Sequence, residues 1–348
     1  MTLSIAVSGA TGYAGGEVLR LLAIHPEVRV DTVTAHSSAG MRMGQLAPHL
    51  ASVAELTVEE TTVENLSRAD VVFLALPHGA SAEVAAQLPE STLVIDAGAD
   101  HRLDQSRDWS RFYDTEYAGH WPYGLPELIL ADGTKQRERL RNTRRIAVPG
   151  CYPTASILAL APGMQAGLLD PEDVVIVAAS GTSGAGKALK PHLLASEAMG
   201  SMSPYGVGGV HRHTPEIEQG IRWATEREAQ VSFTPTLAPM PRGILATCTA
   251  HVAPGVGIEE LREAYEGAYG QERYVRMLPE GQWPTTQSVL GSNHAHLQLA
   301  LDQRSRRAII TAAIDNLAKG TAGGAIQSMN IALGLPEDLG LAQEGLAP

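Results

Sequence analysis

The chain has 348 residues, enough for two domains with separate hydrophobic cores. Acidic residues outnumber basic ones by 38 to 26, and the net charge of −12 argues against nucleic acid or an anionic membrane as a partner. The two cysteines, Cys151 and Cys248, are too few for a disulfide scaffold and favour a reducing, cytoplasmic setting. We expect neither a signal peptide nor a membrane span, because no long apolar segment occurs.

The N-terminal segment predicts a βαβ unit. Residues 3 to 7 form an apolar strand, residues 17 to 25 have helical periodicity, and residues 28 to 34 form a second strand. Between the first strand and the helix lies a Gly-x-x-Gly-x-x-Gly turn, which is typical of dinucleotide binding. Glycine lets the backbone N–H groups approach a pyrophosphate. We therefore predict cofactor contacts at Gly9, Thr11, Gly12, Tyr13, Ala14 and Gly15.

Strands and helices alternate further along the chain. Apolar runs at 71–76 and 93–96 predict buried parallel strands, with a helix at 80–88 between them. Residues 145–148 predict the last strand of this sheet. The alternation indicates an α/β fold with a Rossmann-type, doubly wound parallel sheet, which binds ligands at the carboxyl ends of its strands.

The pattern of predicted strands and helices changes after about residue 170. Long strands at 174–178, 231–234, 244–252 and 296–301 are joined by loops and helices, which predicts an α+β domain with a mixed or antiparallel sheet. The stretch from 312 to 333 predicts one helix with a glycine-containing interruption. The tail from 334 to 348 is weakly structured by composition.

Cys151 stands at the end of the predicted strand 145–148, between a Pro-Gly and a Tyr-Pro step. An apolar run at 156–160 follows and predicts the start of a helix. A thiol at a helix N-terminus feels the positive end of the dipole, which favours the thiolate. A small buried hydrophobe is the commoner fate of a free cysteine. The position at a strand end favours a nucleophile instead.

A pair of histidines, His211 and His213, lies one residue apart and precedes Glu216. In an extended segment the two rings share a face, and either could be a general acid/base for Cys151. A purely structural role for the pair is one alternative. A His-x-His-x-x-Glu metal set is another, but we expect no metal.

A second glycine-rich loop runs from Ser180 to Lys187 after the strand at 174–178. Ala188 follows Lys187 where a P-loop needs a hydroxyl, so a nucleoside triphosphatase is disfavoured. The loop is either a flexible connection or a second ligand-facing loop near a nicotinamide and an acyl phosphate. In the second case its cofactor residues are Ser180, Ser183 and Gly184.

These features together predict one chemistry. The Cys151 thiolate attacks an activated acyl group and expels the leaving group, and hydride from a nicotinamide reduces the resulting thioester to an aldehyde. The substrate would be a small anionic acyl phosphate. Arg102 and Arg242 lie in strand-end loops where they could bind it, although a solvated surface arginine is the alternative for each.

Seven motifs, in this order along the chain, resemble those of the N-acetyl-γ-glutamyl-phosphate reductases, NADPH-dependent enzymes of arginine biosynthesis. The resemblance covers essentially the whole chain. The motifs are Gly9-Ala-Thr-Gly-Tyr-Ala-Gly15, Leu76-Pro77-His78-Gly79, Asp100-His101-Arg102-Leu103, Tyr123-Gly-Leu-Pro-Glu127, Pro149-Gly-Cys-Tyr-Pro-Thr154, His211-Arg-His-Thr-Pro-Glu216 and Asp315-Asn-Leu-Ala-Lys-Gly320.

The resemblance implies that Cys151 is the nucleophile and that a histidine of the pair is the acid/base, with His213 favoured over His211. It places Tyr205 and Glu216 in the substrate pocket, and it implies a homodimer or homotetramer. It also implies that the helix from Asn316 to Asn330 returns to the dinucleotide domain. The NADP(H) contacts then include Pro77, Asn316 and Lys319. The expected domains are 1–149 with 316–348 for the dinucleotide, and 150–315 for catalysis, substrate binding and oligomerisation.

The chain departs from the family pattern at two places. The family often has a basic residue after the second strand, where a 2′-phosphate would sit, but this chain has Ala35 to Gly40 there. That segment holds no acidic residue to bind a ribose 2′-OH, so NADP stays preferred over NAD, with Ser37 and Ser38 on the phosphate. His101 replaces an aromatic residue commonly seen before Arg102, which leaves the role of that loop open.

Three alternatives stay open. Reductases of a carrier-bound aminoadipyl phosphate in lysine biosynthesis tend to have Asn-Ala after the cysteine, so Tyr152-Pro153 and the net charge of −12 favour the arginine enzyme. Aspartate-semialdehyde dehydrogenases usually present Asn-Cys rather than Gly-Cys. A non-catalytic NADP-binding regulator would not need both Cys151 and the histidine pair.

Overall fold

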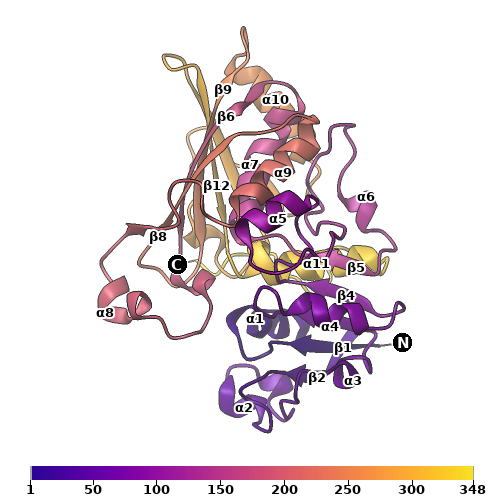
Figure 1. The fold of residues 1–348 in the computed structure, drawn as a ribbon. Coiled ribbons are helices and arrows are strands. Elements are labelled where there is room, and N and C mark those ends of the chain that lie inside the picture. Colours follow the sequence, from indigo (N-terminus) through magenta and orange to yellow (C-terminus); the bar gives the residue numbers. More distant parts are fainter. Residues whose placement is uncertain (1, 348) are drawn as a thin grey trace. The chain divides into compact units, whose positions relative to one another are not determined.

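The computed structural model describes residues 2–347, and the chain forms two compact units (Figure 1). The first unit comprises the chain up to Gly124, with Arg139–Pro149 and Thr321–Ala342. The second comprises Leu125–Glu138, Gly150–Gly320 and the residues from Gln343 onward. Each unit is built around its own β-sheet.

The first unit contains five parallel strands in the order β2-β1-β3-β4-β5, and this confirms the predicted Rossmann-type sheet. Every residue of β3 and β4 is buried, as the continuous apolar runs predict for strands covered on both faces. The strands are β1 (Leu3–Ser8), β2 (Val28–Thr34), β3 (Val71–Leu74), β4 (Leu93–Asp96) and β5 (Arg145–Ala147).

Helices connect these strands and cover the sheet. α1 packs against β1 and β2 and also contacts α11. α1 begins at Tyr13, four residues before the predicted start, because the glycine turn feeds directly into the helix. The helices are α1 (Tyr13–Leu22), α2 (Met43–Leu46), η1 (Ala51–Val53), α3 (Val63–Leu66), α4 (Ser81–Gln87), α5 (Ser106–Phe112) and α11 (Gly323–Ala332), while α6 (Arg137–Leu140) crosses the border between the two units.

The second unit contains a mixed seven-stranded sheet in the order β10-β11-β12-β9-β6-β8-β7, as predicted for this half of the chain. The pairs β10/β11 and β6/β8 are parallel, and the other pairs are antiparallel. The strands are β6 (Leu169–Ser180), β7 (Ser203–Pro204), β8 (Val231–Leu237), β9 (Ile244–Val252), β10 (Val275–Met277), β11 (Ala295–Asp302) and β12 (Arg307–Ile314).

One face of this sheet is buried under helices, because α7 packs against β9 and β12 and α9 packs against α7 (Figure 1). Along β9 every second residue is buried and the intervening residues are only partly buried, which is the period of a strand with one covered face. On β6, Val175 and Val177 are exposed. The remaining elements are α7 (Cys151–Gln165), η2 (Thr182–Ala185), η3 (Pro191–Leu193), α8 (Ala195–Ala198), α9 (Thr214–Thr225), α10 (Ile258–Tyr269), η4 (Gln287–Val289) and the π-helical turn η5 (Ala318–Ala322).

The single helix predicted from 312 to 333 is wrong at its start. Residues up to Ile314 belong to β12, because their backbones pair with β9 on one side and with β11 on the other. The π-helical turn η5 and then α11 follow. An apolar run rich in alanine does not by itself distinguish a buried strand from a buried helix.

The two units differ from the division made on the sequence. Residues 125–138, 316–320 and the tail from 343 onward lie in the second unit, whereas the sequence division put them with the dinucleotide domain. Long-range bonds hold the first of these segments in the second unit. Lys135 Nζ donates to the carbonyl oxygen of Ala268 in α10 at 2.7 Å, and the Ala131 N–H donates to the carbonyl oxygen of Trp223 in α9 at 2.9 Å. Within residues 2–347, no helix is long and apolar enough to cross a bilayer.

Candidate active site

The glycine-rich turn of the first unit, between β1 and α1, requires glycine at two positions. Gly9 has φ +75°, and a Cβ there would lie 2.1 Å from the carbonyl oxygen of Ala75. A Cβ on Gly15 would lie 2.3 Å from the carbonyl oxygen of Gly9. Gly12 is the N-cap of α1 and has no side chain with which to cap the first N–H groups of the helix. This tight, glycine-lined helix N-terminus fits the pyrophosphate of a dinucleotide.

The other cofactor residues predicted for the first unit lie in loops at the same edge of the sheet. Ser37 and Ser38 follow β2, and Pro77 follows β3. Because β2 and β3 flank β1 in a parallel sheet, their following loops emerge beside the glycine-rich turn. Ser37 and Pro77 are exposed, and Ser38 is half-buried. The fold thus gathers these predicted residues at one edge.

The loop after β4 has a structural role that the sequence left open. The Asp100 carboxylate accepts hydrogen bonds from the backbone N–H groups of Gly79, Ser81 and Ala82, at 2.7 to 3.1 Å, and so holds the loop after β3 and the start of α4. His101 stacks on Trp121 with ring centroids 3.6 Å apart. An imidazole therefore fills the place of the family's aromatic residue.

Arg102, predicted to bind substrate, is 6% exposed. Its guanidinium donates to the carbonyl oxygens of Val148 at 2.7 Å and Ala97 at 2.9 Å. These carbonyls follow β5 and β4, so Arg102 ties together the ends of two neighbouring strands. A substrate role for Arg102 stays a prediction.

Cys151 is the first residue of α7, with Gly150 as its N-cap. The predicted helix start is confirmed, and the helix begins at the cysteine itself. α7 is 15 residues long, so the thiol sits at the positive end of a substantial helix dipole. Cys151 is only half-buried, whereas Cys248 is buried. A partly accessible thiol at a helix N-terminus has the environment of a reactive cysteine.

Two side chains from the start of α9 contact the residue that precedes Cys151. His213 is the N-cap of α9, and a Cβ on Gly150 would lie 2.6 Å from His213 Nε2. Glu216 is 1% exposed, and its Oε1 accepts a hydrogen bond from the Gly150 N–H at 2.8 Å. The structure thus brings Cys151, His213 and Glu216 together. In this arrangement the Glu216 carboxylate holds the turn that carries the cysteine.

His211 has different surroundings from His213. Its Nδ1 accepts a hydrogen bond from the backbone N–H of His213 at 3.1 Å. Its ring makes edge contacts with Tyr152, Tyr205 and Phe233. Burial, helped by the neighbouring charge of Arg212, lowers the pKa of His211 to about 4. The ring is therefore neutral near pH 7, and it supports the His213 backbone.

The depressed pKa of His211 predicts a loss of stability in mild acid. Between pH 6.5 and about pH 4 the unfolded chain binds a proton at His211 that the folded protein does not, so the free energy of unfolding falls as pH falls. We expect this group to contribute a loss of about 2 kcal/mol between pH 8 and pH 5. Urea unfolding at both pH values, for the wild type and His211→Asn, measures it. An equal loss in both proteins would contradict the assignment.

Tyr205, predicted to lie in the substrate pocket, shares a hydrogen bond with Tyr152, with the two hydroxyl oxygens 2.8 Å apart. Tyr205 as a whole is 40% exposed, but desolvation of its hydroxyl raises its pKa to about 12, and burial also raises the pKa of Tyr152. Both hydroxyls therefore stay protonated at neutral pH. One donates to the other, and the O–H that remains can donate to a carbonyl oxygen. Tyr152 was missed as a site residue, although it directly follows Cys151 in sequence.

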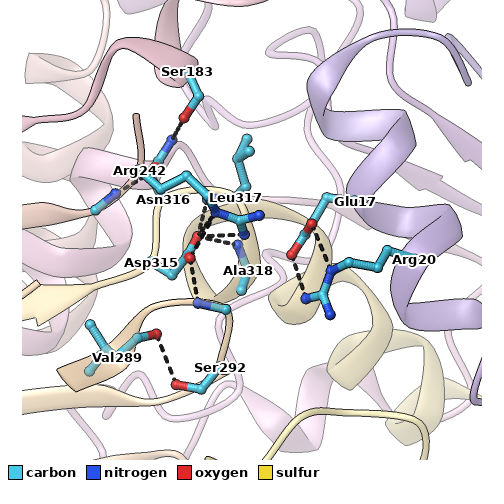
Figure 2. A network of polar contacts seen from close by, with 12 residues as sticks. Glu17, Arg20, Ser183, Arg242, Val289, Ser292, Asp315, Asn316, Leu317 and Ala318 are labelled. Carbon is cyan, nitrogen blue, oxygen red and sulfur yellow. Dashed lines mark hydrogen bonds and ion pairs between the residues drawn. The ribbon is translucent and has the colours of Figure 1, made fainter. Parts of the chain in front are cut away.

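The second glycine-rich loop is held by the predicted cofactor residue Asn316. Asn316 Nδ2 donates to Ser183 Oγ at 3.0 Å, and its Oδ1 accepts from the Gly243 N–H at 2.8 Å (Figure 2). A Cβ on Gly184 would lie 3.8 Å from Asn316 Nδ2, and Ser180 is buried at the end of β6. The structure thus brings Ser180, Ser183, Gly184 and Asn316 together, all within the second unit.

Arg242, also predicted to bind substrate, forms a two-pronged ion pair with Asp315. Arg242 Nε and Nη2 lie 2.9 and 2.8 Å from the carboxylate oxygens (Figure 2). The same carboxylate accepts from the backbone N–H groups of Gly291, Leu317 and Ala318, at 2.7 to 2.9 Å. Asp315 is fully buried and Arg242 is partly exposed. The pair orders the start of the segment 315–320.

Lys319, predicted to bind the cofactor, is buried in the second unit. Its Nζ donates to Glu127 Oε1 at 2.7 Å, and the side chains of both residues are at most 1% exposed. The ammonium also lies 5.7 Å from the ring centroid of Tyr274. This placement commits the charge of Lys319 to an internal ion pair.

The Lys319→Met variant distinguishes a structural ion-pair role for Lys319 from the predicted cofactor-binding role. Removing the ammonium leaves Glu127 buried without its charge partner, so we expect the free energy of unfolding to fall by about 3–5 kcal/mol. The folded variant should keep its NADPH affinity. Denaturant unfolding and NADPH titration measure the two effects, with the exposed Lys190→Met as control. A tenfold weaker NADPH affinity with unchanged stability would instead support a cofactor role.

The sequence reasoning missed three buried carboxylates that organise these loops, Asp100, Glu127 and Asp315. Each lies inside a motif that carried the family resemblance, and that was the available signal. Within residues 2–347, the structure contains no cluster of three or more His, Cys, Asp or Glu side chains suited to a metal ion.

Comparison with known proteins agrees with this two-part architecture. A family model described as semialdehyde dehydrogenase, NAD binding domain, matches residues 4–136. A second, described as semialdehyde dehydrogenase, dimerisation domain, matches residues 151–316. The chain therefore contains an NAD(P)-binding domain, followed by a domain of a type that mediates dimerisation.

Full-length relatives are close. The N-acetyl-gamma-glutamyl-phosphate reductases of Micrococcus luteus and an Arthrobacter species are each 66% identical to this chain, over 100% of both chains. That of Streptomyces avermitilis is 60% identical over the same extent.

Solved structures share the fold at low sequence identity. Aspartate semialdehyde dehydrogenase II from Vibrio cholerae, complexed with ASA, superposes with a TM-score of 0.69 at 17% identity, over 95% of this chain and 98% of that chain. Aspartate semialdehyde dehydrogenase from Candida albicans, with NADP, gives 0.67 at 16% identity over the same shares.

Proposed function

The chain belongs to the N-acetyl-gamma-glutamyl-phosphate reductase family, and we propose that it reduces N-acetyl-L-glutamyl 5-phosphate with NADPH. The products are N-acetyl-L-glutamate 5-semialdehyde and phosphate, in a step of arginine biosynthesis. The observation that carries the proposal is the placement of the half-buried Cys151 at the N-terminus of α7, with His213 against the preceding glycine. Full-length identity of 66% to reductases of this name supports the same activity.

The chemistry follows from what this site offers. The Cys151 thiolate attacks the carbonyl carbon of the acyl phosphate, the bond from that carbon to the phosphate oxygen breaks, and phosphate leaves with the bonding electrons. The product of this step is a thioester on Cys151. Hydride addition to the thioester carbon gives a thiohemiacetal. The general base removes the hydroxyl proton of the thiohemiacetal, the C–S bond breaks, and the aldehyde leaves as the thiolate is regenerated.

We assign His213 as the acid/base of these steps. Its ring lies against Gly150, whereas His211 is neutral near pH 7 and accepts a hydrogen bond from the His213 backbone. Protonated His213 stabilises the Cys151 thiolate and donates a proton to the oxygen that becomes anionic after hydride addition. Tyr205, Arg242 and Arg102 remain proposed substrate contacts, and Glu216 fixes the Cys151 turn.

The cofactor assignment is NADP(H), which supplies the hydride when bound. Gly9, Gly12 and Gly15 leave room for its pyrophosphate at the N-terminus of α1. Ser37 and Ser38 after β2 carry hydroxyls for a 2′-phosphate. The fold neighbour from Candida albicans, solved with NADP, supports this choice. In this proposal the first unit binds the cofactor, and the second provides catalysis and oligomerisation.

A homo-oligomer, as a dimer or a tetramer, completes the proposal. It is supported by the match of residues 151–316 to a dimerisation domain and by the exposed valines of β6, Val175 and Val177. A cytoplasmic location is supported by the two free thiols, which suit a reducing compartment.

The reverse reaction tests the proposal directly. Purified protein is incubated with N-acetylglutamate semialdehyde, phosphate and either NADP⁺ or NAD⁺, and NADPH or NADH formation is followed by absorbance. We expect phosphate-dependent turnover that favours NADP⁺. Turnover restricted to a carrier-bound aminoadipate semialdehyde would instead identify the lysine-pathway activity. NADPH binding without turnover on either substrate would identify a regulator.

A further inference from the structure

Gly320, a buried glycine at the end of the segment 315–320, lies directly against the nucleophile. A Cβ built on Gly320 would lie 2.8 Å from Cys151 Cβ and 3.2 Å from Cys151 Cα. Carbon atoms in contact ordinarily lie about 3.5–4.0 Å apart. Gly320 does not have the positive φ that favours glycine. The Cβ would also lie 3.2 Å from Ile314 Cδ1, the end of a flexible side chain, so the shortest contact that it makes is with Cys151.

Two charge pairs, of which Lys319–Glu127 is fully buried, fix the backbone that carries Gly320. Asp315 anchors the start of the segment through Arg242 and three backbone N–H groups, and its carbonyl oxygen accepts the Gly320 N–H at 3.0 Å. Lys319, the residue before Gly320, is locked to Glu127. Gly320 itself lies within the π-helical turn η5, and such turns occur frequently at functional sites.

We propose that Gly320 is a positioning residue that sets the position of the Cys151 thiol by packing against it. The Asp315 and Lys319 ion pairs hold Gly320 in place. Because the proposal concerns how the nucleophile is held, it rests on the proposed function of Cys151. Glu216 and His213 contact Gly150, the residue before Cys151. Cys151 therefore has little freedom to shift when a methyl group is added at Gly320. A nucleophile displaced by about 1 Å loses on the order of 10²-fold in rate.

Gly320→Ala tests this, with Gly267→Ala as the matched control. Gly267 lies exposed in α10, and a Cβ there meets nothing within 4 Å. We expect Gly320→Ala to lower kcat by about 30- to 100-fold, with little change in the KM for the acyl substrate or in NADPH affinity. The control should match the wild type. Equal kcat in the folded Gly320→Ala variant and the wild type would overturn the proposal.

Alkylation of Cys151 by iodoacetamide, followed by mass spectrometry across a pH series, reports on the thiol without turnover. A thiol moved away from its place at the helix N-terminus loses dipole stabilisation of its thiolate. The pH profile of Gly320→Ala should therefore move to higher pH, and that of Gly267→Ala should not. An unmoved profile would count against the positioning role. If the wild type showed no reductase activity, the proposed function would fail, but this readout would still decide the role of Gly320.

If Gly320→Ala folds poorly, a second substitution tests whether contact with Cys151 is the cause. Cys151→Gly removes the Cβ that the new methyl group meets. Cys151→Gly combined with Gly320→Ala should therefore restore the melting temperature towards that of Cys151→Gly alone. A double variant no more stable than Gly320→Ala alone would overturn the contact on which the proposal depends.

Discussion

Replacing Cys151 with serine is expected to lower kcat by at least about 10³-fold while NADPH affinity stays unchanged. The hydroxyl is close in size to the thiol but stays protonated near neutral pH, so the positive end of α7 has no thiolate to stabilise. Steady-state kinetics in the aldehyde-oxidising direction and NADPH titration measure the two quantities. Turnover near that of the wild type would rule out the thioester route.

The second cysteine provides the matched control. Cys248 lies in β9, is fully buried, and burial raises the pKa of its thiol to about 12. It therefore stays protonated and out of reach of substrate. We expect folded Cys248→Ala to keep kcat close to that of the wild type, with some loss of stability from the removed sulfur. A loss of turnover equal to that of Cys151→Ser would show that removing either thiol disturbs the fold.

His213→Asn is expected to lower kcat by about 10²- to 10⁴-fold, with a much smaller change in KM. The imidazole of His213 lies against Gly150, the residue before Cys151, and we propose it as the group that exchanges protons with Cys151 and the reacting oxygen. Kinetics across a pH series measure both effects.

His211→Asn is the comparison variant. An asparagine oxygen can replace His211 Nδ1 as the acceptor for the His213 N–H, so the backbone support is retained. Because the pKa of His211 is about 4, no charged imidazolium is lost near pH 7. We expect the loss in kcat to be well below that of His213→Asn. A larger loss for His211→Asn would reverse the assignment.

The two histidines show what the sequence alone cannot predict about the site. His211 and His213 share a motif and a spacing, and neither distinguishes them. Their surroundings differ because α9 begins at Thr214, which places His213 at the helix N-cap against Gly150 and leaves His211 among aromatic rings. The pKa of His211 follows from that burial. A local sequence pattern does not reveal which side chains become buried by segments distant in the chain.

Lys319 shows the same limit for charge. The family resemblance implies that Lys319, like Asn316, contacts NADP(H). Its partner Glu127 lies 192 positions away, and only the tertiary fold brings the two into one buried pair. Gly320 is a related case, since nothing in its neighbours along the chain indicates that Cys151 packs against it.

The sequence by itself determined the parallel sheet of the first unit, the glycine turn before α1, and Cys151 at the start of a helix. These depend on apolar periodicity and on glycine spacing, which act within a few residues. The tertiary structure alone decided that residues 312–314 extend β12, because their partners are β9 and β11. It also decided the surroundings of Lys319, His211 and Gly320, because each depends on desolvation and contact between residues far apart in the chain.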